Sequence, residues 1–81
     1  MKHTERLIIV AGTYCASARR SRSRVSTIIF NDGKRLDRIA DGADLTTTAW
    51  ERAMQWLSDN WPEGLEWPAG VERPKVREVQ P

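Results

Sequence analysis

Apolar residues gather in three short runs in the first half of the chain, and each run predicts a strand or a strand-like arm. Arg6 to Cys15 reads RLIIVAGTYC, rich in β-branched residues with polar atoms at its ends, which favours a strand buried on both faces. Ala16 to Arg24 is full of Ser and Arg without apolar periodicity, and it predicts a solvated loop. Val25 to Phe30 then predicts a second strand.

A tight turn is indicated directly after this second strand. Asn31, Asp32 and Gly33 all tolerate the positive φ angles of hairpin turns, so together they predict a hairpin. The second arm of this hairpin, Lys34 to Ala40, carries mainly charged side chains, which is typical of a strand at the edge of a sheet. The three segments predict a three-stranded antiparallel meander.

A helical period follows the turn at Asp41 to Asp44. Apolar side chains recur there on one predicted helix face: Trp50, Ala53, Met54 and Leu57. Thr48 and Glu51 have the spacing of a capping box, so we expect this helix to begin at Thr48. The predicted fold class is therefore α+β, with one α-helix packed on the three-stranded antiparallel meander in the order β-β-β-α.

The composition changes after Asn60, because all four Pro of the chain lie beyond it. Pro lacks a backbone donor and disfavours helix at the preceding residue. We predict a single small α+β domain over residues 1–60 and an extended Pro- and Trp-rich tail over residues 61–81, with at best a short extra strand near residues 75–79. Disorder, a fourth strand and a clasp over the helix stay open as alternatives for this tail.

The order of these elements resembles the N-terminal half of the ribonuclease H-like fold. Ile8 to Thr13 is similar to the first-strand motif that ends in Asp-Gly-Ser, and Thr46 to Glu51 is similar to the Thr-rich helix start whose Glu is catalytic. The resemblance implies a degenerate, truncated scaffold: Glu51 matches one metal-site carboxylate, but Ala11 stands where an Asp would bridge two cations. Two-metal hydrolysis needs several converging carboxylates, so the resemblance implies no such activity here.

Candidate catalytic residues are sparse in the rest of the chain. His3 is the single His and lies at the N-terminus, so we predict neither a catalytic triad nor a His metal site around it. Cys15 is the single Cys and has no His partner, which is more typical of a small core residue than of a nucleophile. We therefore expect a protein that is not an enzyme and that uses no cofactor and no metal.

Size and composition indicate where such a protein acts. A single Cys cannot form an internal disulfide, which favours a reduced, cytoplasmic setting. The longest apolar run begins at Leu7 and is far shorter than the roughly 20 residues that span a bilayer, so we expect no membrane partner.

Charge and aromatic residues supply the candidate binding site. The net charge is +2, but Arg19, Arg20, Arg22 and Arg24 lie close together with no acid among them, so they predict a local positive field. Trp is also abundant for 81 residues, with four in the chain. The predicted partner-binding residues are Arg19, Arg20, Arg22, Arg24, Trp61 and Trp67.

Three binding roles fit these residues. The first is an inhibitor or adaptor that docks on a protein or nucleoprotein complex, in the style of the small inhibitors of bacteriophages and mobile elements, including anti-CRISPR proteins. The second is direct nucleic-acid binding, in which the Arg side chains contact phosphates. The third is a homodimeric structural protein that pairs sheet edges. A merely solvated, solubilising loop is an equally good reading of the Arg run.

Overall fold

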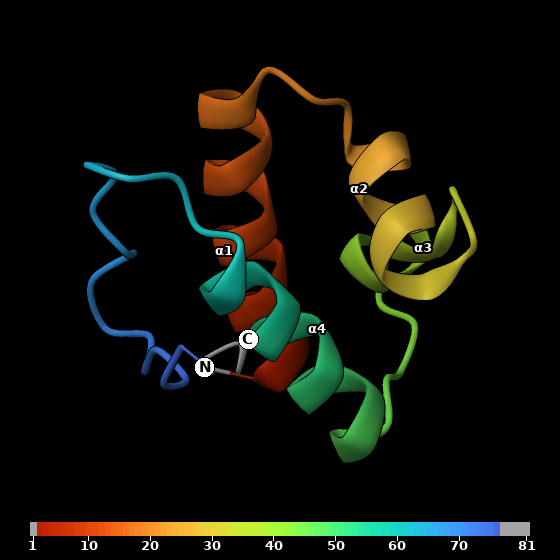
Figure 1. The fold of residues 1–81 in the computed structure, drawn as a ribbon. Coiled ribbons are helices and arrows are strands. Elements are labelled where there is room, and N and C mark those ends of the chain that lie inside the picture. The colour runs from red at the N-terminus through yellow and green to blue at the C-terminus, as the bar shows by residue number, and fades with distance from the viewer. Residues whose placement is uncertain (1, 77–81) are drawn as a thin grey trace, which may run out of the picture.

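The computed structural model describes residues 2–76, and over this range the chain folds into four α-helices and no strand (Figure 1). The helices are α1 (His3–Ala18), α2 (Arg22–Phe30), α3 (Arg35–Ala40) and α4 (Thr47–Asp59). α1 and α4 lie side by side in the centre, with α2 and α3 on one side and the segment after α4 on the other. None of these helices has both the length and the apolarity needed to cross a bilayer.

The predicted α+β fold, a three-stranded antiparallel meander with one helix, is therefore wrong. The run from Arg6 to Cys15 lies within α1. A helical period is present in it, because the buried residues follow a spacing of three and four: Leu7, Val10, Ala11 and Tyr14. Ile8 and Ile9 fill the gaps between these positions, and Ile9 is 42% exposed, so the run imitates a strand buried on both faces.

The second and third predicted strands are helical as well, and the hairpin between them is absent. Val25 to Phe30 belongs to α2, and most of Lys34 to Ala40 forms α3. Asn31 does adopt a positive φ of 56°, but there it ends α2, and its N–H donates to the Thr27 carbonyl at 2.8 Å. Residues that tolerate positive φ serve helix ends as well as hairpins, so this turn signal was ambiguous.

The predicted loop over Ala16 to Arg24 is also wrong, because α1 continues to Ala18 and α2 begins at Arg22. The predicted helix α4 is confirmed, with Ala53, Met54 and Leu57 buried.

The start of α4 differs from the prediction. It begins at Thr47 and is capped by Thr46, whose hydroxyl accepts from the Ala49 N–H at 3.1 Å. Thr48 and Glu51 are exposed residues of α4, and Glu51 lies beyond its first turn, so they form no capping box.

An all-helical fold conflicts with the ribonuclease H-like resemblance. Ile8 to Thr13, which resembled that fold's first strand, lies in the middle of α1. Ala11 is a core residue, 2% exposed, that packs among apolar side chains. In this structure the Ala11 methyl group is part of the helical core.

The segment after α4 forms two successive turns of the same build. The pattern Trp-Pro-x-Gly followed by an apolar residue occurs at residues 61–65 and again at residues 67–71. In each, the indole N–H donates to the carbonyl four residues on, at 2.8 Å for Trp61 and 2.9 Å for Trp67. Gly64 and Gly70 have φ of 80° and 81°, as type II turns require. The repeated pentapeptide therefore encodes a repeated turn.

Val71 anchors this segment in the core, where it is 8% exposed. Further along, Arg73 donates from its guanidinium to the Ser58 carbonyl at 2.9 Å and lies 5.4 Å above the Trp67 ring. The strand predicted near residues 75–79 is not found at residues 75 and 76, which have no regular secondary structure, and residues 77–79 lie outside the described part of the chain.

Candidate nucleic-acid interface

The connection between α1 and α2 consists of three residues held in one conformation by backbone bonds. Arg19 takes the left-handed conformation with φ 55° and ψ 40°. The N–H of Arg20 donates to the Cys15 carbonyl at 3.1 Å, which closes the end of α1 in a Schellman-type motif. Ser21 then caps α2, because its hydroxyl accepts from the Arg24 N–H at 3.0 Å. The four predicted Arg thus lie on an ordered turn and the first turn of a helix.

All four of these Arg side chains are exposed: Arg19, Arg20, Arg22 and Arg24. Arg22 pairs with Asp37 of α3 at 3.2 Å, and both side chains remain about half exposed. The ion pairs among the described residues include none formed by Arg19, Arg20 or Arg24. Three of the four charges are therefore free to meet an external anion.

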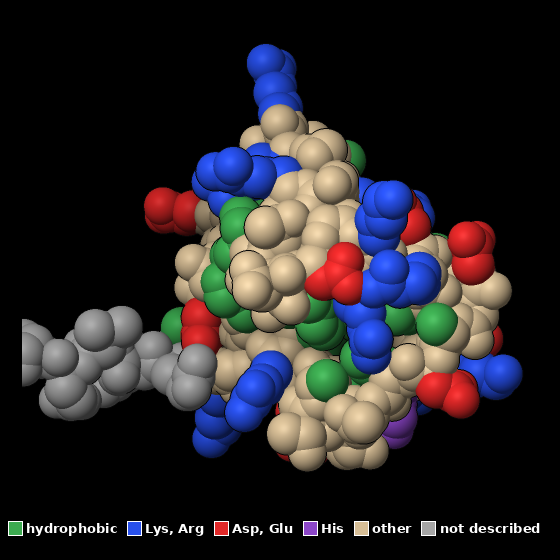
Figure 2. Space-filling model, turned by 90° about the vertical axis from the view of Figure 1, so that its right-hand side faces the viewer, with side chains coloured by type: hydrophobic (Ala, Val, Ile, Leu, Met, Phe, Trp, Pro, Cys, Tyr) green, Lys and Arg blue, Asp and Glu red, His purple; other side chains and the backbone are tan. Residues whose placement is uncertain are grey.

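The positive charge extends onto α3. Between residues 19 and 38 the sequence has seven Lys or Arg against two Asp, a balance of +5, whereas the rest of the chain has six basic and nine acidic residues, a balance of −3. Lys34, Arg35 and Arg38 supply the additional positive charges, which sequence reasoning did not connect with the Arg cluster. Figure 2 shows the side of the molecule that carries α2 and α3, with Lys and Arg side chains over its upper and central parts.

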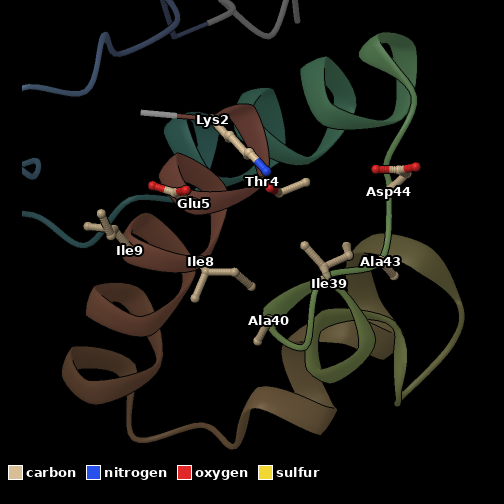
Figure 3. Close-up of a pocket in the computed structure, with 10 residues that line it drawn as sticks. Lys2, Thr4, Glu5, Ile8, Ile9, Ile39, Ala40, Ala43 and Asp44 are labelled. Carbon is tan, nitrogen blue, oxygen red and sulfur yellow. The ribbon is translucent and has the colours of Figure 1, made fainter.

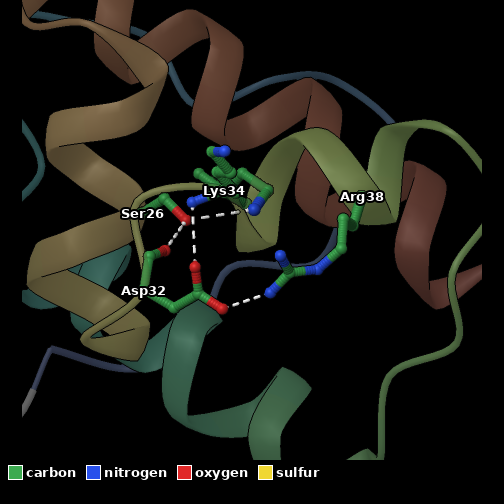
Figure 4. Close-up of polar contacts among 5 residues, drawn as sticks. Ser26, Asp32, Lys34 and Arg38 are labelled. Carbon is green, nitrogen blue, oxygen red and sulfur yellow. Dashed lines mark hydrogen bonds and ion pairs between the residues drawn. The ribbon is translucent and has the colours of Figure 1, made fainter.

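A buried serine holds α2 and α3 together under this charged surface (Figure 4). Ser26 is fully buried, donates its hydroxyl to the Asp32 carbonyl at 2.5 Å and accepts from the Leu36 N–H at 3.0 Å. A Cβ on Gly33 would lie 2.9 Å from the hydroxyl oxygen of Ser23, so Gly permits the close approach of this turn to α2. Ser26 thus links α2 to the start of α3 and to the turn between them.

The Asp32 carboxylate organises the same turn. One of its oxygens accepts from the Lys34 N–H at 3.0 Å, and the other pairs with the Arg38 guanidinium. These contacts lower the pKa of Asp32, with the backbone N–H of Lys34 as the main cause and the charge of Arg38 adding to it. Asp32 and Asp37 are thus both engaged by Arg, which reduces their repulsion of an approaching anion.

The two predicted Trp of the site lie elsewhere. Trp61 and Trp67 are half-buried, pack against the core with ring centroids 4.6 Å apart, and donate their indole N–H groups to their own turns. Their segment lies on the opposite side of α1 and α4 from α2 (Figure 1). The structure therefore brings the four Arg together and separates them from Trp61 and Trp67.

The structure shows what surrounds His3 and Cys15, the two residues considered for catalysis. His3 begins α1 and stacks on Trp50, with ring centroids 4.5 Å apart. Burial raises the pKa of the Cys15 thiol, an effect that the nearby charge of Arg22 partly opposes, so the thiol is protonated and a weak nucleophile at neutral pH. No cluster of three or more potential metal-ligating His, Cys, Asp or Glu side chains occurs among residues 2–76.

A hollow of about 480 Å³ lies between the N-terminal half of α1 and the α3 end (Figure 3). Ile8 from α1 and Ile39 and Ala40 from α3 form its apolar wall. The titratable groups among its lining residues are Lys2, Glu5 and Asp44, which are all exposed and form no ion pair with one another. This hollow has neither a nucleophile with a base nor a paired acid and base.

Sequence reasoning missed the helical spacing of residues within α2. Ser23 and Thr27, four residues apart, are exposed, and Val25 and Ser26 between them are buried. Ser21 before them is a typical N-cap.

No protein-family model, curated protein or solved structure was found to match this chain.

Proposed function

We propose that this protein is a small nucleic-acid-binding module that contacts phosphates through the turn between α1 and α2. The observation that carries the proposal is the exposure of Arg19, Arg20 and Arg24, free of ion pairs within the described structure, in the segment of residues 19–38, whose charge balance is +5. Arg is well suited to phosphate because its planar guanidinium donates two parallel hydrogen bonds.

The fixed geometry of the turn adds to this argument. A phosphate contact gains more free energy when the donor need not be ordered on binding. The Schellman-type end of α1 and the Ser21 cap already hold the backbone of this turn. The ordered backbone supports the proposal, because it fixes the positions from which the Arg side chains extend.

Docking on a protein complex as an inhibitor stays a prediction with weaker support. It drew on exposed Trp side chains beside the Arg cluster, since Trp and Arg dominate protein interfaces. Trp61 and Trp67 lie on another side of the molecule, and their N–H groups are already bonded to Leu65 and Val71 carbonyls.

The proposal is tested by the salt dependence of binding. We would measure the binding of mixed-sequence DNA, duplex and single-stranded, by fluorescence polarisation between about 50 and 200 mM salt. The test variant changes Arg19, Arg20 and Arg24 to Ala. Each lost phosphate contact reduces the slope of log K against log salt by about 0.9 on duplex DNA, so the loss of two to three contacts should reduce it by about 1.8–2.7.

The matched control changes Lys2, Arg52 and Lys75 to Ala, three exposed residues outside the α1–α2 turn. It removes the same net charge as the test variant, so long-range effects of charge are equal in the two. We expect its slope to stay within about one unit of the wild-type slope. Equal losses in the two variants, or no binding of any nucleic acid by the wild type, would reject the proposed function.

A further inference from the structure

We propose that the nucleic acid is double-stranded DNA and that α1, the turn and α2 form a helix-turn-helix unit whose second helix enters the major groove. This inference rests on the function proposed above and names the ligand of the same site. Three independent features carry it: the geometry of the turn, the exposed face of α2 and the chemistry of the side chains on that face.

The turn has the length of a helix-turn-helix connection, which joins two packed helices by three or four residues. Residues 19–21 separate Ala18 at the end of α1 from Arg22 at the start of α2. Helix-turn-helix turns often contain Gly at this bend, because one residue must take a positive φ. Arg19 takes that conformation here, with φ 55°, and adds a positive charge to the turn.

α2 is fixed to the core by one face and leaves the other without a partner. Val25 and Ser26 are fully buried, and Ile29 and Phe30 are half-buried. The exposed residues of α2 and its C-terminal cap recur at helical spacing on the opposite face: Arg24, Thr27, Ile28 and Asn31. An α-helix with its side chains is about 10–12 Å across, and the major groove of B-DNA is about 12 Å wide. The exposed helix thus has dimensions that fit this groove.

The side chains on this face are of the types that read base edges. Arg pairs with guanine and Asn with adenine through two hydrogen bonds each. The Thr27 hydroxyl already donates to the Ser23 carbonyl at 3.0 Å, so Thr27 contributes its methyl group, which packs on thymine. Ile28 is 38% exposed on a face that is otherwise polar, and an apolar contact with thymine methyl groups would cover it. α2 contains no acidic residue, so nothing on the helix itself repels the phosphates that flank the groove.

The same features disfavour RNA and single strands. The major groove of an A-form duplex is too narrow and deep for side chains to read, so a protruding helix does not fit it. Proteins that bind single strands use exposed aromatic rings on which bases stack. The exposed face of α2 has no aromatic residue, and the Trp side chains of the protein are partly buried against the core.

The first experiment compares three probes of one sequence pool: duplex DNA, single-stranded DNA and duplex RNA. We expect the full chain to bind duplex DNA at least about tenfold more tightly than the other two. Equal or tighter binding of single strands or of duplex RNA would overturn the major-groove inference and leave the proposed nucleic-acid function standing. A failure to bind any of the three probes would reject both.

The second experiment asks whether α2 reads bases. We would select binding sites from a random duplex pool with the wild type and with a variant carrying Arg24→Ala and Asn31→Gly. Gly keeps the positive φ of residue 31, so α2 keeps its end, and melting curves verify the fold. We expect a sequence motif with the wild type and, with the variant, a loss of about tenfold or more in preference for that motif.

The matched variant for this experiment changes Arg19 and Arg20 to Ala. We expect it to lower the affinity for the selected site and for random DNA alike, because phosphate contacts carry no sequence information. Enrichment of no motif by the wild type, or an unchanged motif and preference with the Arg24→Ala, Asn31→Gly variant, would overturn base reading by α2.

Discussion

Replacing Ser26 by Ala tests whether α2 and α3 depend on one buried hydroxyl. Ser26 is fully buried and bridges the Asp32 carbonyl and the Leu36 N–H. In Ser26→Ala the N–H of Leu36, itself a fully buried residue, loses its partner without gaining water. An unsatisfied buried group costs about 1–3 kcal/mol, and in a domain of this size each kcal/mol lowers Tm by about 4–8 °C. We therefore expect Tm to fall by on the order of 5–20 °C.

The assay is thermal unfolding followed by circular dichroism, with Ser23→Ala as the matched control. Ser23 lies in the same helix but is exposed, so its change should alter the unfolding free energy by less than about 0.5 kcal/mol. Hydrogen exchange adds a local readout, because the Leu36 amide should exchange faster in Ser26→Ala. If Ser26→Ala and Ser23→Ala melt together and the Leu36 amide stays protected, the hydroxyl does not join the two helices.

Two further predictions concern stability. Gly70→Ala places a side chain at φ 81° in the second Trp-Pro turn and should lower the free energy of unfolding by about 1–2 kcal/mol. Gly12→Ala, in α1 with open space around its Cβ, should raise the free energy of unfolding by about 0.5–1 kcal/mol. Urea unfolding measures both variants, and changes of equal sign in the two would contradict the backbone argument. Because its folded pKa is lowered, Asp32 stabilises the fold above its unfolded pKa of about 3.9, and this stability is lost as pH falls through the folded value. Asp32→Asn should therefore weaken the acid dependence of unfolding below about pH 4, and identical acid profiles for wild type and Asp32→Asn would refute the role of that carboxylate.

The sequence alone was sufficient for α4 and for the position of the positive charge. Ala53, Met54 and Leu57 recur at helical spacing between mostly polar residues, although the capping residue is Thr46 and not the predicted Thr48. The Arg cluster is local in sequence, so its members must lie near one another in any fold. Properties that depend on neighbours along the chain were thus predictable.

The tertiary structure decided whether the other apolar runs became helices or strands. The residues from Leu7 to Cys15 are apolar at nearly every position, so a strand period and a helix period both fit, and packing against α4 selects the helix. α3 has six residues and is too short to be stable alone, so it depends on Ser26 and on the burial of Leu36 and Ile39. A strand, too, would have needed partners that only the whole chain supplies.

The tertiary structure also turned a basic segment into a candidate interface. In sequence, Arg19 to Arg24 has the polar composition of a solvated loop, and the N-cap signal of Ser21 is not enough by itself to show that α1 ends and α2 begins around it. Folding orders the turn, directs Val25 into the core and leaves the Arg24 face of α2 in solvent. The same packing places Trp61 and Trp67 on another side, where their indole N–H groups donate within their own turns. The sequence alone determines which residues are charged and where they lie along the chain. Which surface presents these charges depends on which side chains the folded core buries.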